Sequence, residues 1–314
     1  MPPELSVVIP TWNRLQDLRR TLASLREHEG PPFEVIVVDN ASTDGTPDWV
    51  EAHHPEVTVL RLPENRGPTG ARNAGVLMAR AAIVVLLDSD TEPMPGALAG
   101  IANRFAGDPE LGAVNALQID LRTRLPWWWW GPHGYPCEEY VDREFDTAFK
   151  IEEGACGIRR SLYLQVGGFD ERFFMLVEGR DLAARVVRAG HRVRYCPEVR
   201  FLHCQESNRP TSNAVYRSSG RLYFEFRNEI WYTWRYFPVG LALIKSAANA
   251  VSTLRIAARE RALGAWLRGY LDGARGLGWT LRHRLPLGQA QLRQVVSRRN
   301  RRWLRGREGA GTPA

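Results

Sequence analysis

Several signatures of other protein classes are missing from this 314-residue sequence. Its four cysteines form no CxxC pair and no spacing typical of a zinc site, so we expect reduced, structural thiols. No stretch of about 18 uncharged apolar residues occurs, because Lys245, Ser246 and Asn249 interrupt the most apolar candidate. The first residues lead directly into an apolar strand pattern and lack the charged and long apolar segments of a secretory signal. We therefore expect a cytoplasmic protein without a membrane-spanning helix.

Charge is distributed unevenly along the chain. Residues 1–205 carry 22 Lys+Arg against 29 Asp+Glu, a net charge of −7, whereas residues 206–314 carry 20 against 6, a net charge of +14. We predict two domains with these bounds, the second a basic, aromatic-rich helical extension whose end, 298–314, is frayed. Aromatic anchors among arginines favour an anionic membrane surface, which would place the protein peripherally on the inner face of the plasma membrane. A helical cap with surface arginines is the alternative, and no nucleic-acid partner is expected.

Short apolar, β-branched runs alternate with helical patterns over the first ninety residues. Continuous apolar runs are typical of strands buried on both faces, as in parallel sheets. The predicted strands are 5–9, 33–38, 57–62 and 82–87, and the predicted helices are 15–25, one beginning at 44–46, and 70–81. This alternation predicts an α/β fold with a doubly wound sheet.

The pattern loosens after residue 90. A helix is predicted at 95–106, a strand at 112–119, a helix at 182–190, and two short strands at 193–197 and 199–203. Between them lies an aromatic loop, 125–137, with four consecutive tryptophans, Trp127–Trp130. These tryptophans either cover a cleft, stack on a sugar or touch a membrane, or they pack on the helices of the extension.

Polar side chains follow the predicted strands where ligands of doubly wound sheets bind. The segments 10–14, 39–46 and 88–90 would lie side by side. Asp88 and Asp90 need a bend to serve one ligand, and could then hold Mg²⁺ or Mn²⁺ with positions left open for phosphate oxygens. A solvated turn is the alternative interpretation.

Glycines with flanking arginines in the loop 65–73 look like a phosphate cradle at a helix start. The loop matches neither GxGxxG nor GxxxxGK[ST], which argues against dinucleotide-binding and P-loop proteins. A glycine-rich connection with surface arginines is the simpler interpretation of the loop taken alone.

Five segments, in this order and spacing, together resemble family 2 glycosyltransferases of the GT-A fold over residues 5–205. They are LSVVIPTWNR, VIVVDNASTDGT, NRGPTGARNAG, LLDSDTEP and GGFDERFF. The resemblance implies a Rossmann-like, doubly wound mixed sheet and the transfer of a sugar, with inversion, from a UDP- or dTDP-sugar. It also implies a divalent cation, a glycan or lipid-linked acceptor, and a role in cell-surface or lipid-linked glycan synthesis.

The resemblance also implies roles for individual residues. Asp39 would accept a hydrogen bond from the pyrimidine ring nitrogen. The metal ligands would be Asp90, Asp88 and His203, with Asp90 the more direct ligand of the DxD pair. The residues implied to contact the nucleotide-sugar are Pro10, Thr11, Asn13, Asp39, Arg66, Arg72 and Asp88.

One position departs from the family pattern. Relatives commonly carry an Asp after the Glu as general base, and here Gly179 takes its place. Glu178 is the first candidate for the base, and Asp181 is the second, with helix capping or an ion pair as the alternative role of Asp181. The missing Asp also raises a second hypothesis, a catalytically impaired nucleotide-sugar-binding scaffold. A nucleotidyltransferase is disfavoured, because PTWNR stands where a Gly-rich, Lys-bearing loop is expected.

Overall fold

The computed structural model describes residues 2–126, 141–204, 219–289, 291 and 292. The described residues form two compact units, one of residues 2–126 and 141–204 and one of residues 219–292. The tryptophan run, Cys137 and the segment 298–314 lie outside the described residues, so the predictions made for them stay predictions.

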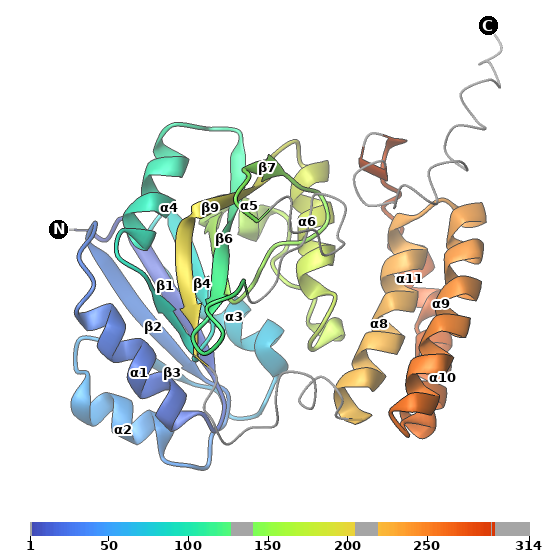
Figure 1. Cartoon of the computed structure of the whole chain (residues 1–314), viewed down its shortest axis with the longest axis horizontal. Helices are drawn as coiled ribbons and strands as arrows, with labels where there is room; N and C mark the ends of the chain where they lie inside the picture. The colour runs from blue at the N-terminus through green and yellow to red at the C-terminus, as the bar shows by residue number, and fades with distance from the viewer. Residues whose placement is uncertain (1, 127–140, 205–218, 290, 293–314) are drawn as a thin grey trace, which may run out of the picture. The chain divides into compact units, whose positions relative to one another are not determined.

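A nine-stranded mixed sheet forms the centre of the first unit (Figure 1). Its strand order is β3-β2-β1-β4-β8-β6-β9-β5, with β7 paired to β9. The strands β3, β2, β1 and β4 run parallel, and β8 is antiparallel to both β4 and β6. The carboxyl ends of β2, β1 and β4 therefore meet at one edge of the sheet.

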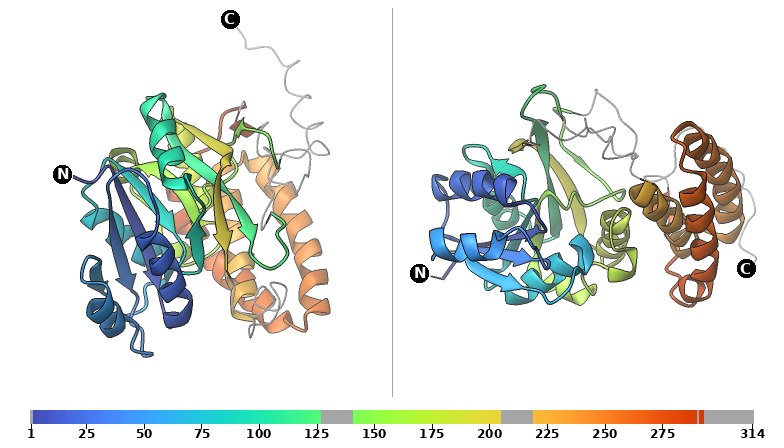
Figure 2. Two further views of the ribbon diagram at one scale, coloured as in Figure 1. Left: turned by 60° about the vertical axis from the view of Figure 1, so that its left-hand side comes forward. Right: turned by 90° about the horizontal axis from the view of Figure 1, so that it is seen from below.

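Helices cover both faces of this sheet, as both views in Figure 2 show. Leu5, Val7 and Ile9 of β1 pack in one apolar core with residues of α1 and α4, whereas Val8 packs in a second core with residues of α3, α5 and α6. Alternate side chains of a strand point to opposite faces, and both faces are buried here. This explains why the strands read as continuous apolar runs.

Among the described residues, the first unit contains nine β-strands, one 3-10 helix (η2) and six α-helices. They are β1 (Leu5–Thr11), α1 (Leu15–Arg26), β2 (Phe33–Asp39), α2 (Thr46–His53), β3 (Thr58–Arg61), α3 (Gly67–Met78), β4 (Ile83–Leu87), β5 (Thr91–Pro93), α4 (Ala97–Ala106), β6 (Leu111–Asp120), β7 (Phe145–Asp146), β8 (Ala155–Arg159), α5 (Arg160–Gln165), η2 (Glu171–Phe173), α6 (Glu178–Arg188) and β9 (Arg192–His203).

The expected doubly wound sheet is confirmed, but two local predictions are wrong. The two short strands predicted at 193–197 and 199–203 are a single strand, β9. Ala116 of β6 pairs with Cys196 and the next residue, Leu117, pairs with Arg200, so the residues between are an irregularity within β9. Pro197 has no N–H to donate, and a bulge accommodates it without ending the strand. The helix predicted at 182–190 also begins earlier, at Glu178.

The second unit is helical, as expected for the extension. Its helices are α8 (Ser219–Tyr236), α9 (Val239–Arg259), α10 (Leu263–Arg275) and α11 (Leu277–Arg282). Helix α10 approaches α8 closely at two glycines. A Cβ at Gly269 would lie 2.9 Å from the Tyr223 carbonyl oxygen, and one at Gly273 would lie 2.5 Å from Ile230 Cδ1. Within the described part of the chain, no helix is both long and apolar enough to span a bilayer.

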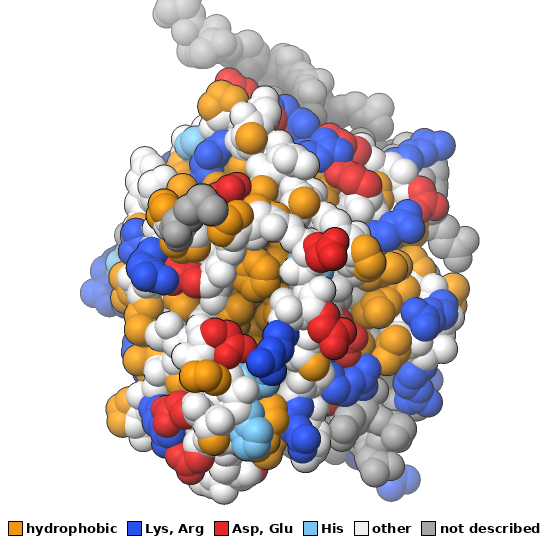
Figure 3. Space-filling view, turned by 90° about the vertical axis from the view of Figure 1, so that its left-hand side faces the viewer, with side chains coloured by type: hydrophobic (Ala, Val, Ile, Leu, Met, Phe, Trp, Pro, Cys, Tyr) orange, Lys and Arg blue, Asp and Glu red, His pale blue; other side chains and the backbone are white. Residues whose placement is uncertain are grey.

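The surface carries both signs of charge. On the face shown in Figure 3, acidic and basic side chains are interspersed among apolar ones. That face therefore presents no field of a single sign that would attract a polyanion over a broad area.

Candidate functional site

The loops after β1 and β2 are joined by hydrogen bonds at the carboxyl edge of the sheet. Thr11 and Asp39 are register partners at the last positions of these two strands. Asn13 Oδ1 accepts a hydrogen bond from the Thr43 backbone N–H at 2.8 Å, and the Asn13 N–H donates to Ser42 Oγ at 2.9 Å. Two of the predicted donor-contacting segments are thus held together, with Pro10 half-buried beside them.

Two acceptor atoms at this edge are buried without a hydrogen bond from any described residue. Asp39 is 2% exposed and Thr11 is 3% exposed, and Asp39 Oδ1 and Thr11 Oγ1 have no partner there. The other oxygen of Asp39 accepts from the Ser42 N–H at 3.1 Å. Leaving a buried acceptor unsatisfied costs about 1–3 kcal/mol. A ligand that carries an N–H, such as a nucleotide base, would satisfy Asp39 Oδ1.

The side-chain amide of Asn40 holds the glycine-rich loop by hydrogen bonds. The Arg66 N–H donates to Asn40 Oδ1 at 2.9 Å, and Asn40 Nδ2 donates to the Gly67 carbonyl oxygen at 3.0 Å. The Arg66 guanidinium is paired with Glu171 of η2 at 2.7 Å and is partly exposed. Glu171 engages only Nη2 of Arg66, so the other N–H groups of this guanidinium can still donate to a ligand.

Asp88 lies between the buried Arg72 and the loop that precedes β8. Arg72 Nη2 is 2.5 Å from Asp88 Oδ1, and the Asp88 N–H donates to the Gly154 carbonyl oxygen at 3.1 Å. A Cβ at Gly154 would lie only 2.5 Å from Asp88 Oδ2. Glycine at 154 thus permits this loop to approach Asp88. Asp88 keeps 37% of its side chain exposed, so it remains accessible to a ligand.

Asp88 and Asp90 are related by the bend that the sequence requires. The Thr91 N–H donates to the Asp88 carbonyl oxygen at 3.1 Å, which closes a turn, and Thr21 Oγ1 donates to the Ser89 carbonyl oxygen. Asp90, directly beyond the turn, is 7% exposed, and its backbone carbonyl accepts from the Cys204 N–H at 2.7 Å. The turn consequently exposes the carboxylate of Asp88 to solvent and buries that of Asp90.

Asp90 lies beside His203, the last residue of β9. His203 Nε2 is 3.5 Å from Asp90 Oδ1, and Arg14 Nη1 is 3.4 Å from Asp90 Oδ2. Burial raises the pKa of Asp90, the charge of Asp88 raises it further, and His203 and Arg14 oppose this. Carboxylate and imidazole are ligand types that Mn²⁺ accepts. Asp90 and His203 are therefore the two predicted ligands that the structure brings together, and their donor types fit a divalent cation, whereas the Asp88 carboxylate is held by Arg72.

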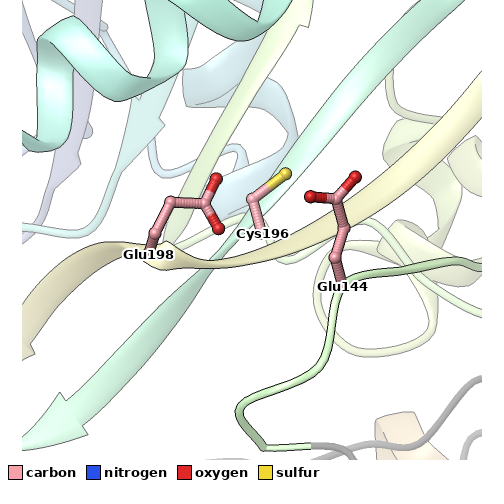
Figure 4. Close-up of side chains that lie close together, drawn as sticks. All are labelled: Glu144, Cys196 and Glu198. Carbon is pink, nitrogen blue, oxygen red and sulfur yellow. The ribbon is translucent and has the colours of Figure 1, made fainter.

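A second group of potential metal ligands fits a cation less well. Figure 4 shows Glu144, Cys196 and Glu198, whose potential ligand atoms lie within 4.8 Å of one another. Both carboxylates are paired with Arg104, at 2.8 Å and 2.5 Å. Burial and the charge of Glu198 raise the pKa of Cys196 to about 12, so the thiol keeps its proton. Ion pairs already neutralise this group.

Two glutamates converge on Arg72 from other elements. Glu178 begins α6 and is 4% exposed, and its Oε2 has no hydrogen-bond partner among the described residues. Burial raises the pKa of Glu178 to about 8, the charge of Glu153 contributes, and Arg72 opposes. Burial alone would lower the pKa of Arg72, but Asp88, Glu153 and Glu178 outweigh it and raise the pKa. Arg72 is thus the shared counter-ion of three carboxylates.

Asp181 has a different environment from Glu178, although both lie in the first turn of α6. Asp181 is fully buried, and its Oδ2 accepts from Arg185 Nη2 at 2.5 Å and Nε at 3.0 Å. This is the ion pair that we named as the alternative to catalysis. The Asp181 carboxylate is engaged by Arg185, whereas one oxygen of Glu178, Oε2, has no hydrogen-bond partner among the described residues.

Glu153 was not among the residues selected from the sequence. It lies in the loop before β8, next to Glu152, and both are paired with Lys150, at 3.3 Å and 2.9 Å. The only sequence signal is two adjacent acidic residues before the small-residue segment 154–157. No spacing rule connects this loop to Arg72 or Gly179, because the connection is made by tertiary packing.

Comparisons with known proteins agree with this arrangement. A family model described as "Glycosyl transferase family 2" matches residues 6–167. The chain is similar to the pre-mycofactocin glycosyltransferase of Mycobacterium tuberculosis, 28% identical over 99% of this chain and 74% of the relative. It is also similar to the N-acetylglucosaminyl-diphospho-decaprenol L-rhamnosyltransferase of the same organism, 28% identical over 83% of this chain and 97% of the relative.

Solved structures with the same fold include two complexes with nucleotide sugars. The mannosyltransferase PcManGT from Pyrobaculum calidifontis, in complex with GDP-Man and Mn²⁺, matches with a TM-score of 0.54 and 21% identity over 99% of this chain and 81% of that one. S. aureus TarS 1-349 in complex with UDP-GlcNAc matches with a TM-score of 0.55 and 21% identity over 72% of this chain and 65% of that one. The fold of the first unit is therefore GT-A.

Proposed function

The chain belongs to glycosyl transferase family 2, and from that premise we propose that it transfers a sugar from a UDP- or dTDP-sugar to an acceptor hydroxyl with inversion. The acceptor class that we propose is a glycan or a lipid-linked glycan in cell-surface synthesis. The lipid-linked substrate in the name of the rhamnosyltransferase relative supports this choice.

One observation carries the proposal of a pyrimidine nucleotide: the buried, unsatisfied Asp39 Oδ1 beside Thr11 Oγ1. A uracil or thymine ring carries an N–H at its N3 position, and this N–H would donate to Asp39. The hydrogen bond would be charge-assisted and would also remove the cost of the unsatisfied acceptor. The base would thus lie over the ends of β1 and β2, with its diphosphate extending toward the end of β4.

At the end of β4, we propose that Asp90, His203 and Asp88 hold Mg²⁺ or Mn²⁺. A bound divalent cation supplies positive charge to the diphosphate leaving group. Arg72 fixes the Asp88 carboxylate by its 2.5 Å contact. A carboxylate near Arg72 accepts the proton of the acceptor hydroxyl, and Glu178 was the candidate selected from the sequence.

Substitution at Asp90 tests the metal proposal. Asp90→Ala should abolish Mn²⁺-dependent transfer and the increase in melting temperature that Mn²⁺ with UDP produces in the wild type. Glu198→Gln, in the second ligand group, is the matched control and should keep both. Retention of metal-dependent transfer by Asp90→Ala would exclude this cation site.

Gly179 stands where relatives carry the general base, and this motivates the alternative hypothesis of a catalytically impaired scaffold. The enzyme and the scaffold hypotheses predict different results. A scaffold would bind UDP with a measurable thermal shift and yet show no transfer and no donor hydrolysis across UDP- and dTDP-sugars. The enzyme should release UDP in an acceptor-dependent manner. A coupled assay for UDP release separates the two.

We further propose that the second unit binds an anionic membrane surface. Leu263, Leu267 and Leu271 lie four residues apart on α10 and are 49–54% exposed, while Ala265, Gly269 and Gly273 are buried. This is the reverse of a helix that buries its leucines in a core. Residues 219–292 carry 11 Lys+Arg against 4 Asp+Glu, a net charge of +7, which complements anionic headgroups.

Vesicle sedimentation tests the membrane proposal. The wild type should bind vesicles with 30% phosphatidylglycerol and bind pure phosphatidylcholine weakly. Leu267→Glu should reduce binding several-fold, whereas Leu77→Glu, at an equally exposed leucine of the first unit, should not. Equal binding of both vesicle types by all three proteins would refute the electrostatic part of the proposal.

A further inference from the structure

The position of Gly179 leaves no room for a side chain. A Cβ built there would overlap the carbonyl oxygen of Ile151, and it would lie 2.7 Å from Glu153 Oε1 and 2.9 Å from Glu153 Cδ. The Ile151 N–H also donates to the Gly179 carbonyl oxygen at 3.0 Å. The loop before β8 is therefore packed against the start of α6, and only glycine at 179 permits this packing.

The same distances place a carboxyl group at the position that Gly179 leaves empty. An Asp at 179 would carry its carboxyl carbon one bond beyond Cβ, in the volume that the Glu153 carboxyl group now approaches. Glu153 comes from another segment of the chain, the loop before β8. The carboxylate that the sequence lacks at 179 is thus present in space.

The surroundings of Glu153 suit a group that receives a proton. Lys150 Nζ lies 3.3 Å from Glu153 Oε2, and the other oxygen, Oε1, faces Gly179. The side chain of Glu153 remains 11% exposed. Arg72 interacts electrostatically with Glu153, Glu178 and Asp88 alike, so this carboxylate lies in the same charge cluster as the proposed donor-binding Asp88.

Glu178 provides the independent sign that a ligand group belongs here. Its Oε2 is buried, 4% of the residue is exposed, and no described residue donates a hydrogen bond to that oxygen. A hydroxyl from a bound acceptor would satisfy it. Because burial and the charge of Glu153 raise the pKa of Glu178 to about 8, Glu178 holds its own proton near neutral pH. A carboxyl group that carries a proton can position a hydroxyl by hydrogen bonding.

We propose that Glu153, from the loop before β8, is the general base of the sugar transfer, and that Glu178 positions the acceptor hydroxyl beside it. This inference rests on the proposed function and replaces Glu178 as the base. In the step, the acceptor O–H proton passes to Glu153 Oε1 as the oxygen forms a bond to the anomeric carbon. The bond from that carbon to the phosphate oxygen breaks, and its electron pair leaves with the nucleoside diphosphate. Glu153 then returns the proton to water.

Isosteric substitution with matched controls tests the assignment in the full-length protein. Glu153→Gln should lower kcat for transfer at least about 100-fold, the range for loss of a general base. It should leave the Kd for UDP within about threefold. Glu152→Gln, at the adjacent residue that Lys150 also contacts, should keep kcat within a few-fold. Glu178→Gln should mainly raise KM for the acceptor.

A second variant separates chemistry from a structural effect. Glu153→Ala should be inactive in chloride buffer and should regain transfer when sodium formate is added at the same ionic strength, because formate can enter the vacated volume as an external carboxylate. A folded Glu153→Gln with kcat near that of the wild type, or a Glu153→Ala that formate does not restore, would overturn the assignment while leaving transfer itself intact. A wild type that binds UDP but transfers no sugar would instead overturn the proposed function, and this assignment with it.

Discussion

The buried carboxyl group of Glu178 should make the stability of the first unit fall as pH rises. Its pKa is raised from an ordinary 4.5 to about 8 by burial and by the charge of Glu153, with Arg72 and Lys150 opposing. Between these two values the folded state holds a proton that the unfolded state has lost. The stabilisation is therefore complete below about pH 4.5, and it is lost as pH rises through 8.

The magnitude follows from the size of the shift. One pKa unit corresponds to about 1.4 kcal/mol. Raising the pKa of Glu178 from 4.5 to about 8 therefore lowers the free energy of unfolding by roughly 2 kcal/mol between pH 6 and pH 8. For a domain of 150–250 residues, that is a decrease in melting temperature of roughly 4–8 °C. Glu178→Gln keeps the shape of the side chain and cannot ionise. The variant should lack this component of the pH dependence and should be the more stable protein at pH 9.

Melting temperatures measured at pH 6, 7, 8 and 9 for wild type and Glu178→Gln test this reasoning. The quantity of interest is the difference between the two curves, because other groups titrate in both proteins. Glu29→Gln, at an exposed glutamate, is the control and should follow the wild type. Parallel curves for wild type and Glu178→Gln would show that Glu178 ionises normally. This would contradict the raised pKa of Glu178 and the charge cluster around Arg72 that explains it.

Three further outcomes are expected. Asp39→Asn should raise the Kd for UDP roughly 10-fold in calorimetry, because a charge-assisted hydrogen bond to the base is lost, and an unchanged Kd would exclude Asp39 as the base acceptor. Gly179→Ala should destabilise the protein by about 1–3 kcal/mol through overpacking against Ile151, whereas Gly107→Ala, whose Cβ would meet nothing closer than 3.8 Å, should not. Asp181→Asn should cost about 3 kcal/mol, because Arg185 loses its buried partner, while UDP binding is retained; weaker UDP binding would point to a direct role of Asp181.

The fold could be predicted from the sequence because its strands are buried on both faces. Val7 and Val8 are both fully buried although they point to opposite faces, so the strand appears as an unbroken apolar run. The one error in strand bounds came from Pro197, which reads as a strand end. Whether a proline ends a strand or forms a bulge depends on the partner strand, here β6, and this is invisible in the sequence.

The site residues that directly follow strands could be predicted from the sequence. Those brought into the site by packing between loops could not. Asp39, Asp88 and Asp90 follow strands directly, so their common edge follows from topology. The engagement of Asp181 by Arg185 could be foreseen as an alternative because the two lie four residues apart on one helix. Glu153 could not be foreseen, because it reaches Gly179 from a loop 26 positions earlier in the chain.

The charge cluster itself argues for an enzyme over a scaffold. Glu153 and Glu178 are both buried beside one buried guanidinium, and the charge of Glu153 disfavours ionisation of Glu178. Such an arrangement costs free energy, and apolar residues of similar volume would stabilise the fold better. A protein that needed only to bind a nucleotide could satisfy that need with Thr11, Asp39 and the metal ligands. A buried carboxylate with a raised pKa, such as that of Glu178, is instead typical of sites that move protons. The cluster therefore makes sense as the proton-accepting side of a transfer reaction, despite the glycine at position 179.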